Sequence, residues 1–245
     1  MNPPLLSISQ TAQLLGVSLQ TLRRWDESGK LKPIRSTATS YRYYRQSDID
    51  SFLQSFPKNI FRMGYTWAVS ATPYEPPAIF FCPTQVVFQA RLQTLFTLLT
   101  KLNSKNVDIP LLIAIIGEIG NNAFDHNLGN WPDISGLFFA YDLKKREVII
   151  ADRGQGVFTT LKRVKPSLTN DVQAVRVAFT EVISGRAPEA RGNGLKFVRN
   201  VIAHNAMQLL FLSGNARLQS MGHSADLTIN ETKGTFHGCL AKINF

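Results

Sequence analysis

The chain has 245 residues, of which 44% are hydrophobic, so it can bury a sizeable core as one large domain or as a small domain joined to a medium one. Its 27 lysine and arginine residues outnumber 17 aspartate and glutamate residues, and the formal net charge of +10 favours polyanionic partners such as nucleic acid or nucleotides. No apolar run reaches the roughly 18 to 20 residues of a membrane span and the first residues do not resemble a signal peptide, so we expect a cytoplasmic protein with no membrane partner.

Residues 1–56 predict a small, basic, mostly helical domain. Ser9 is expected to cap a helix that ends at Gly16, and Ser18 is expected to cap a second helix that ends at Gly29. The short Gly16-Val17-Ser18 segment between them predicts a tight turn. The pattern is therefore helix, turn, helix.

A wing follows the two helices. The segment from Leu31 to Arg45 predicts two short strands, and a last helix begins at Asp48. These landmarks, with Leu22-Arg23-Arg24-Trp25, resemble the winged helix-turn-helix of MerR-type regulators and excisionases over about residues 6–54. In that family the second helix enters the major groove and the wing holds the flanking backbone. The resemblance implies double-stranded DNA as a partner, bound by Ser18, Gln20, Thr21, Arg23, Arg24, Arg42 and Tyr43.

Two questions about this domain stay open. It could bind protein instead of DNA. The long dimerisation helix of MerR proteins is not evident after it, so how two copies would pair in a homodimer is also undecided.

Residues 57–83 hold five of the twelve prolines and show no helical periodicity, which predicts a connection. Its many aromatic residues indicate that it packs on a neighbouring domain. From residue 84 to residue 245 the pattern changes to long helices and adjacent strands, so we expect an α+β fold of the two-layer sandwich type. Helices are predicted at 86–102, 109–127, 171–183 and 193–204, and strands at 134–141, 147–151, 207–212, 224–229 and 235–244.

An acidic and amide-bearing face is predicted on the helix at 109–127. Glu118, Asn122 and His126 follow at four-residue spacing with Asp125 beside them. A carboxylate and an amide oxygen one turn apart are hard ligands of the kind that Mg²⁺ takes, together with water and phosphate oxygens. A solvated polar face is the alternative.

Two glycine-rich turns accompany this helix. The apolar strand at 147–151 runs into Asp152-Arg153-Gly154-Gln155-Gly156, where the glycines allow close approach of a ligand and Asp152 could accept a hydrogen bond from an amine. The loop at Gly192-Asn193-Gly194-Leu195-Lys196 leads into a helix whose N-terminus favours phosphate. A tight turn and an ordinary helix start are the alternative explanations.

In this order and spacing the three segments resemble the nucleotide site of the GHKL superfamily of gyrase, heat-shock chaperone, histidine kinase and MutL ATPases. The resemblance implies ATP and Mg²⁺ as cofactors, with Asn122 on the metal, Asp152 on the adenine amino group and Thr235 near adenine. Glu118 matches the carboxylate that orients a nucleophile. The implied nucleotide-binding residues are Asn122, Asp125, His126, Asp152, Gly154, Gly156, Gly192, Asn193, Gly194, Leu195, Lys196 and Thr235.

Three functions are compatible with the two resemblances. We expect an ATP-responsive DNA-binding regulator, in which nucleotide changes DNA affinity or self-association. A protein serine/threonine kinase like the anti-sigma-factor kinases, localised to DNA, is the second. A slow ATPase in DNA mobility or phage defence is the third. All four histidines lie within or after the acidic helix, which disfavours self-phosphorylation of the histidine-kinase type.

Overall fold

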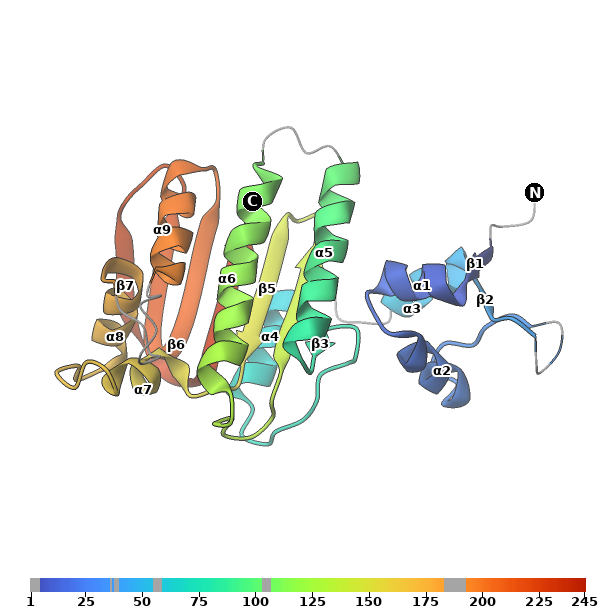
Figure 1. The fold of residues 1–245 in the computed structure, drawn as a ribbon, viewed down its shortest axis with the longest axis horizontal. Helices are drawn as coiled ribbons and strands as arrows, with labels where there is room; N and C mark the ends of the chain where they lie inside the picture. The colour runs from blue at the N-terminus through green and yellow to red at the C-terminus, as the bar shows by residue number, and fades with distance from the viewer. Residues whose placement is uncertain (1–4, 36, 38–39, 55–58, 103–106, 183–192) are drawn as a thin grey trace. The chain divides into compact units, whose positions relative to one another are not determined.

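The computed structural model describes residues 5–35, 37, 40–54, 59–102, 107–182 and 193–245, without the side chains of residues 50, 53 and 54. The chain divides into two compact units (Figure 1). The N-terminal unit comprises Met1–Asn59 and Pro77–Ile79, and the C-terminal unit comprises Ile60–Pro76 and Phe80–Phe245. Each unit has a hydrophobic core of its own. No helix in the described ranges combines the length and apolar character that crossing a membrane requires.

The N-terminal unit contains α1 (Ile8–Leu15), α2 (Leu19–Glu27), α3 (Gln46–Gln54), β1 (Leu5–Ser7) and β2 (Tyr43–Arg45). Its core comprises Ala12, Leu15, Leu22, Trp25, Leu31, Tyr44, Ile49 and Phe52. The predicted turn is present, because Gly16 adopts a left-handed φ of 63° at the end of α1. The expected cap of the first helix is wrong by two residues. Ser7 caps α1 and forms a capping box with Gln10, since the chain enters the helix directly from β1.

The wing differs from the predicted two-stranded hairpin. β2 pairs with β1 at the start of the chain, with Tyr44 opposite Leu6. Within the described part of the wing itself, Ile34 and Tyr43 form an isolated bridge. Long-range pairing with β1 therefore fixes the wing strand, and local sequence does not reveal such a partner.

The C-terminal unit is built on one antiparallel sheet in the order β3-β4-β5-β7-β6. Its strands are β3 (Phe81–Cys82), β4 (Leu137–Asp142), β5 (Glu147–Asp152), β6 (Gln208–Met221) and β7 (Leu227–Asn244). The last two strands replace the three that the sequence predicts, because both continue through polar stretches that alternate buried and exposed side chains. A register shift between Ser213 and Ala216 bends β6 against β7.

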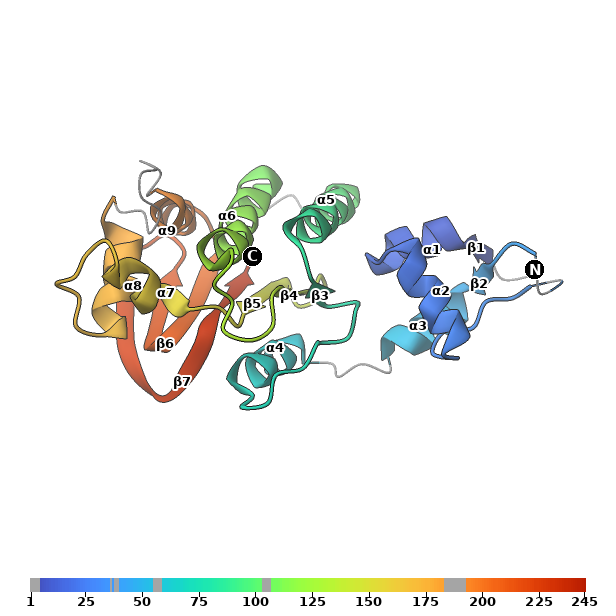
Figure 2. The same cartoon turned by 60° about the horizontal axis from the view of Figure 1, so that its bottom comes forward.

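Helices cover both faces of this sheet (Figure 2). One face carries the larger core and the helices α5 (Gln85–Lys101), α6 (Ile109–Asn127), α7 (Gly156–Lys162), α8 (Asp171–Thr180) and α9 (Gly194–His204). Among these, α7 was not expected from the sequence. The predicted bounds of α6 are confirmed, with Asp108 capping it ahead of Pro110.

The opposite face carries α4 (Ile60–Val69), which lies in the segment predicted to be a connection without helical periodicity. Gly64 permits close packing, since a Cβ there would come within 3.1 Å of both Ile149 and Phe138. Trp67 is buried against Phe81 and Phe138. The arrangement is therefore a mixed fold of helices and a sheet, with helices α5 to α9 on one face of the sheet and α4 on the other, and not a simple two-layer sandwich. The helix was not predicted because the segment is rich in proline, but all five prolines lie outside α4.

Candidate functional sites

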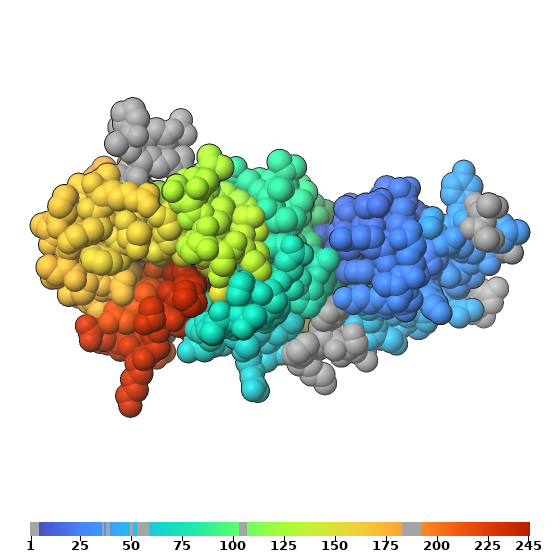
Figure 3. Space-filling model, turned by 90° about the horizontal axis from the view of Figure 1, so that it is seen from below, coloured from blue at the N-terminus to red at the C-terminus, as the bar shows by residue number. Residues whose placement is uncertain are grey.

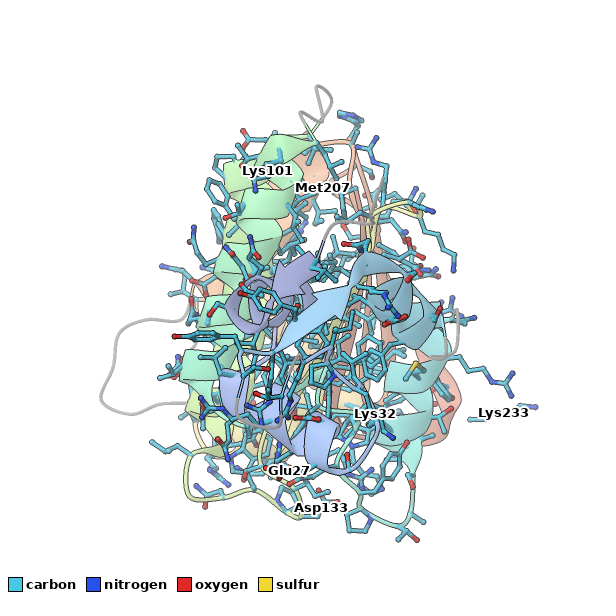
Figure 4. All side chains as sticks on the ribbon, turned by 90° about the vertical axis from the view of Figure 1, so that its right-hand side faces the viewer. Glu27, Lys32, Lys101, Asp133, Met207 and Lys233 are labelled. Carbon is cyan, nitrogen blue, oxygen red and sulfur yellow. The ribbon has the colours of Figure 1, made fainter. Side chains whose placement is uncertain are left out.

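The recognition surface of the N-terminal unit would be the exposed side of α2. Gln20, Arg23 and Arg24 are exposed there, and neither arginine makes an ion pair among the described residues. Glu27, marked in Figure 4 with Lys32, is also exposed and brings one negative charge to this side. The exposed positions of Gln20, Arg23 and Arg24 are consistent with their predicted contribution to DNA binding.

Ser18 and Thr21 have structural roles. The Ser18 hydroxyl accepts a hydrogen bond from the backbone N–H of Thr21 at 3.0 Å, and the two hydroxyls lie 3.0 Å apart. Thr21 is only 8% exposed. Its side chain is buried beside Ser18, the cap of α2, which does not favour contact with DNA, and its predicted contact with DNA stays a prediction.

Arg42 is held within the unit. Its Nε donates to Asp26 at 2.9 Å, and Arg35 pairs with the same carboxylate. This three-residue cluster joins the end of α2 to the wing. The adjacent Tyr43 is 41% exposed and remains on the surface. Arg42 pairs with Asp26 and keeps a partly exposed side chain, and its predicted contact with a DNA phosphate stays a prediction.

In the C-terminal unit, α6 contacts the other two predicted segments. At its middle, Glu118 and Asn122 lie against the first residue of α9. A Cβ on Gly194 would come within 2.4 Å of Oε2 of Glu118 and within 3.7 Å of Nδ2 of Asn122. Only glycine fits without moving Glu118, so this carboxylate lies at the positive N-terminal end of α9.

At its C-terminal end, α6 contacts the turn after β5. Buried Asn127 accepts a hydrogen bond from the backbone N–H of Gln155 at 2.8 Å and donates to the carbonyl of Ala123 at 2.8 Å. A Cβ on Gly154 would come within 2.0 Å of Asn127. Gln155 also donates to the carbonyl of His126 at 3.2 Å. Asn127 was not predicted, although its position four residues after buried Ala123 placed a polar side chain on the apolar face of the helix.

Asp152 ends β5 and is 5% exposed. Its Oδ1 accepts from the backbone N–H of Gly154 at 2.8 Å. Burial raises the pKa of Asp152 to about 7, against hydrogen bonds from the backbone of Gly154 and Cys239 that lower it. Gly238, with φ of 74°, lets β7 pass close to the carboxylate, because a Cβ there would lie 2.3 Å from Oδ1.

A second set of hydrogen bonds holds the start of α7 beside this carboxylate. The Ser213 hydroxyl on β6 accepts from the backbone N–H of Val157 at 2.9 Å and donates to the carbonyl of Gly238 at 3.0 Å. Gly156, with φ of 75°, makes the turn into α7. Ser213 and Gly238 carried no signal in the sequence, because only the pairing of β6 with β7 brings them here.

The other predicted positions fall into three groups. Asp125, His126, Leu195 and Lys196 are partly buried on α6 and α9, and Asn193 precedes α9 without a side-chain cap. Gly192 lies outside the described residues. Thr235 is exposed on β7, and Gly238 and Cys239 are the β7 residues beside Asp152. The structure therefore does not bring Thr235 to the predicted adenine position, because the register of β7 against β5 places later residues there.

Arg153 does not face the polar groups of α6. It is 1% exposed and donates to both oxygens of Asp133, at 3.2 Å and 3.0 Å from Nε. It also donates to the carbonyl of Trp67 at 2.7 Å. The guanidinium of Arg153 is therefore paired with Asp133 and with the carbonyls at the end of α4.

The segments around Asp152 lie at one end of the sheet. Asp133 is at the end of the C-terminal unit opposite to Lys101 and Met207 (Figure 4). Figure 3 views that end, where the green C-terminal part of α6 adjoins the yellow region of α7 and α8. The arrangement offers a buried acceptor at Asp152, and a half-buried carboxylate and amide on α6 beside the N-terminus of α9.

The donor set fits magnesium better as part of a nucleotide complex than as a protein-only site. In the parts of the chain that the structure describes, no group of three or more His, Cys, Asp or Glu side chains is arranged to hold a metal. Mg²⁺ commonly takes one or two protein ligands and completes its octahedron with water and phosphate oxygens. The side-chain amide of Asn122, whose Nδ2 lies near Gly194 at the start of α9, carries one oxygen that could serve as such a ligand.

Comparison with known proteins identifies the N-terminal part. Residues 6–54 match the family model described as MerR HTH family regulatory protein. A stretch of 49 residues, 20% of this chain, is 45% identical to part of the Type II methyltransferase M.Eco47II of Escherichia coli, and the chain spans about an eighth of that protein, 12% of its length. Residues 6–54 therefore form a MerR-type helix-turn-helix, the module of a DNA-binding regulator.

Proposed function

We propose that the chain is a DNA-binding regulator whose C-terminal unit binds ATP with Mg²⁺, and that the bound nucleotide changes DNA affinity or self-association. The observation that carries the ligand site is the position of α6. Near its middle this helix contacts the N-terminus of α9 through Glu118 and Asn122, and at its C-terminal end it contacts the β5–α7 turn through buried Asn127. These contacts span about 13 Å along the helix, which suits an elongated ligand with chemically different ends.

The contacts at the middle of α6 and at its C-terminal end suit different parts of a nucleotide. The buried carboxylate of Asp152 can accept a hydrogen bond from the amino group of adenine. The N-terminus of α9 and the amide of Asn122 suit phosphate oxygens and their magnesium ion. Adenine at Asp152 and phosphates at α9 would therefore place the nucleotide along α6. The resemblance to GHKL ATPases supports the same orientation.

Calorimetric titration with a nonhydrolysable ATP analogue in millimolar magnesium tests the ligand. We expect saturable binding that is lost in Asp152→Ala and weakened in Asn122→Ala. The matched control is Asp142→Ala, which removes a carboxylate from the far end of the β4–β5 hairpin. Absence of binding by the folded wild-type chain would refute the ATP site while leaving the DNA-binding module intact.

The regulatory part of the proposal needs a second measurement. DNA selected from a random duplex library should bind the full chain, and its affinity or the oligomeric state of the protein should change when the ATP analogue is added. Identical values of both with and without nucleotide would exclude regulation.

Phosphoryl transfer to a protein hydroxyl is a second candidate function. It is motivated by Glu118, which is half-buried and lies one helical turn from Asn122, where a carboxylate could accept the proton of an attacking hydroxyl. Radiolabelled γ-phosphate should then appear on a protein partner and disappear with Glu118→Gln. Unchanged transfer by this variant would rule out that role for Glu118.

A further inference from the structure

Arg153 directly follows β5, whose side chains alternate between the two faces of the sheet. Along β5, Val148 and Ile150 pack in the core beneath α6, and Ile149 and Ala151 pack in the core beneath α4. This alternation sends consecutive side chains to opposite faces. Asp152 meets Gly238 and Gly154, whereas Arg153 reaches the carbonyls at the end of α4.

The contacts of Arg153 form a clasp, defined here as Arg153, Asp133 and the carbonyls of Trp67 and Ala68. The guanidinium donates to Asp133 from Nη2 at 2.6 Å, and from Nη1 to Trp67 at 2.7 Å and Ala68 at 3.4 Å. Its burial leaves little freedom to move independently of the backbone, and a planar guanidinium loses this fork when it rotates. Burial opposes ionisation of Asp133, but the hydrogen bonds from Arg153 and Ile134 outweigh it and lower the pKa of this carboxyl.

The helix held by the clasp is joined on both sides to the DNA-binding unit. Residues 55–59 alone separate the end of α3 from the start of α4. After α4 the chain returns to the N-terminal unit at Pro77–Ile79, where Ala78 and Ile79 pack against its core. α4 is therefore covalently connected to the helix-turn-helix on both sides, so a shift of α4 on the sheet would move both points of attachment.

We propose that the clasp couples occupancy at Asp152 to the DNA-binding unit through α4. The inference rests on the proposed function, since it needs a ligand that hydrogen-bonds Asp152. A ligand that moves the backbone of residues 152–154 moves Arg153 with it, and the clasp passes this movement to the C-terminal end of α4. Arg153 and Asp133 are then positioning residues that touch neither ligand nor DNA.

The test measures nucleotide affinity and DNA affinity separately on the full chain. Asp133→Asn keeps the shape of the side chain and removes its charge from the clasp. We expect the ATP analogue to bind this variant within about threefold of wild type, whereas the nucleotide-induced change in DNA affinity, expected to be at least about fivefold in wild type, falls below about twofold.

Glu147→Gln is the matched control. It breaks another partly buried ion pair, that of Glu147 with Lys242 at 2.9 Å, at the opposite end of β5. Lys242 also lies over the ring of Phe61 on α4. This control should keep the full response to nucleotide. An equal loss in both variants would mean that general weakening of the sheet is responsible, and would overturn the proposal.

Hydrogen exchange provides a readout that does not depend on measuring DNA affinity. Addition of the ATP analogue should change exchange in wild-type peptides within residues 60–76, and this change should be absent from Asp133→Asn. If DNA affinity responds while these peptides do not, the coupling runs elsewhere and the clasp is only structural.

The outcomes separate the two proposals. Without nucleotide binding in wild type, the proposed function and the clasp fail together. With nucleotide binding and a DNA response that survives Asp133→Asn, the clasp fails alone. With nucleotide binding but no DNA response in wild type, coupling is refuted and the ligand site stands.

Discussion

Gly194 lies at the proposed ligand site, where a larger side chain would meet Glu118. The residue begins α9 with ordinary helical geometry, so alanine there would be tolerated by the backbone and would favour the helix by roughly 0.5–1 kcal/mol. The added methyl group would, however, meet Oε2 of Glu118. Its effect should therefore fall on the ligand and not on the fold.

We predict that Gly194→Ala lowers affinity for the ATP analogue by at least about tenfold, roughly 1.4 kcal/mol, with unchanged or slightly higher thermal stability. Calorimetric titration and thermal denaturation measure the two effects. Gly129→Ala is a poorer substitution on backbone grounds, because Gly129 has φ of 72°, although a Cβ added there would meet no atom within 4 Å. It should lower stability and spare binding. The reverse pattern would place the ligand elsewhere.

The raised pKa of Asp152 predicts how the stability of the protein depends on pH. Its pKa is about 7 in the folded protein and near 4 in an unfolded chain, so the folded state binds the extra proton between these values. Stability contributed by this group is therefore greatest at low pH and declines as pH rises from about 4 to about 7. Above that range the protein carries the full cost of a buried carboxylate.

Asp152→Asn should consequently gain stability relative to wild type as pH rises from 5 to 8, by roughly 1–3 kcal/mol. The amide oxygen can still accept from the backbone of Gly154, so the turn is kept. Urea denaturation at several pH values measures the difference. A constant difference across this range would mean that Asp152 does not titrate there. The same variant should lose affinity for the ATP analogue.

At the scale of elements, α2 is the helix that we predict to bind DNA. Its buried positions Thr21, Leu22 and Trp25 leave Gln20, Arg23 and Arg24 outward. Replacement of Arg23 and Arg24 by alanine should weaken DNA binding and reduce the slope of log K against log salt by about one for each lost phosphate contact. Neither arginine supports the core, so thermal stability should change little.

Lys144→Ala is the control for that experiment, because it removes an exposed positive charge from the β4–β5 hairpin of the C-terminal unit. Fluorescence anisotropy over a range of salt concentrations distinguishes the variants. Equal losses of affinity in both would indicate a diffuse effect of net charge instead of a surface on α2.

At the scale of the whole molecule, two units with separate cores should unfold separately. Calorimetry of the full chain should resolve two transitions, and Leu22→Ala, at a site with 0% exposure, should lower only the transition of the N-terminal unit. Saturating ATP analogue should raise the other transition, since a ligand stabilises the state that binds it. A single transition that moves with both changes would show that the units fold as one.

Much of the local structure could be predicted because its determinants are local. The cap at Ser18, the left-handed Gly16 and the bounds of α6 all follow from short-range patterns, and the helix-turn-helix of residues 6–54 is confirmed by comparison. The sequence also placed Asn122, Asp152 and Gly194 in three separate polar segments. Their use as a nucleotide site stays a prediction.

The tertiary structure decided what those segments meet. Thr21 is buried beside Ser18, Arg42 pairs with Asp26, and Arg153 donates to carbonyls at the end of α4. Asp26 is distant in sequence from Arg42, and α4 lies in a proline-rich segment that was not predicted to be helical. The sequence by itself determined which residues can cap, turn or ionise, because those properties belong to a side chain and its neighbours along the chain. Which groups are buried together was decided only by the sheet, because strand register sets which distant residues lie side by side.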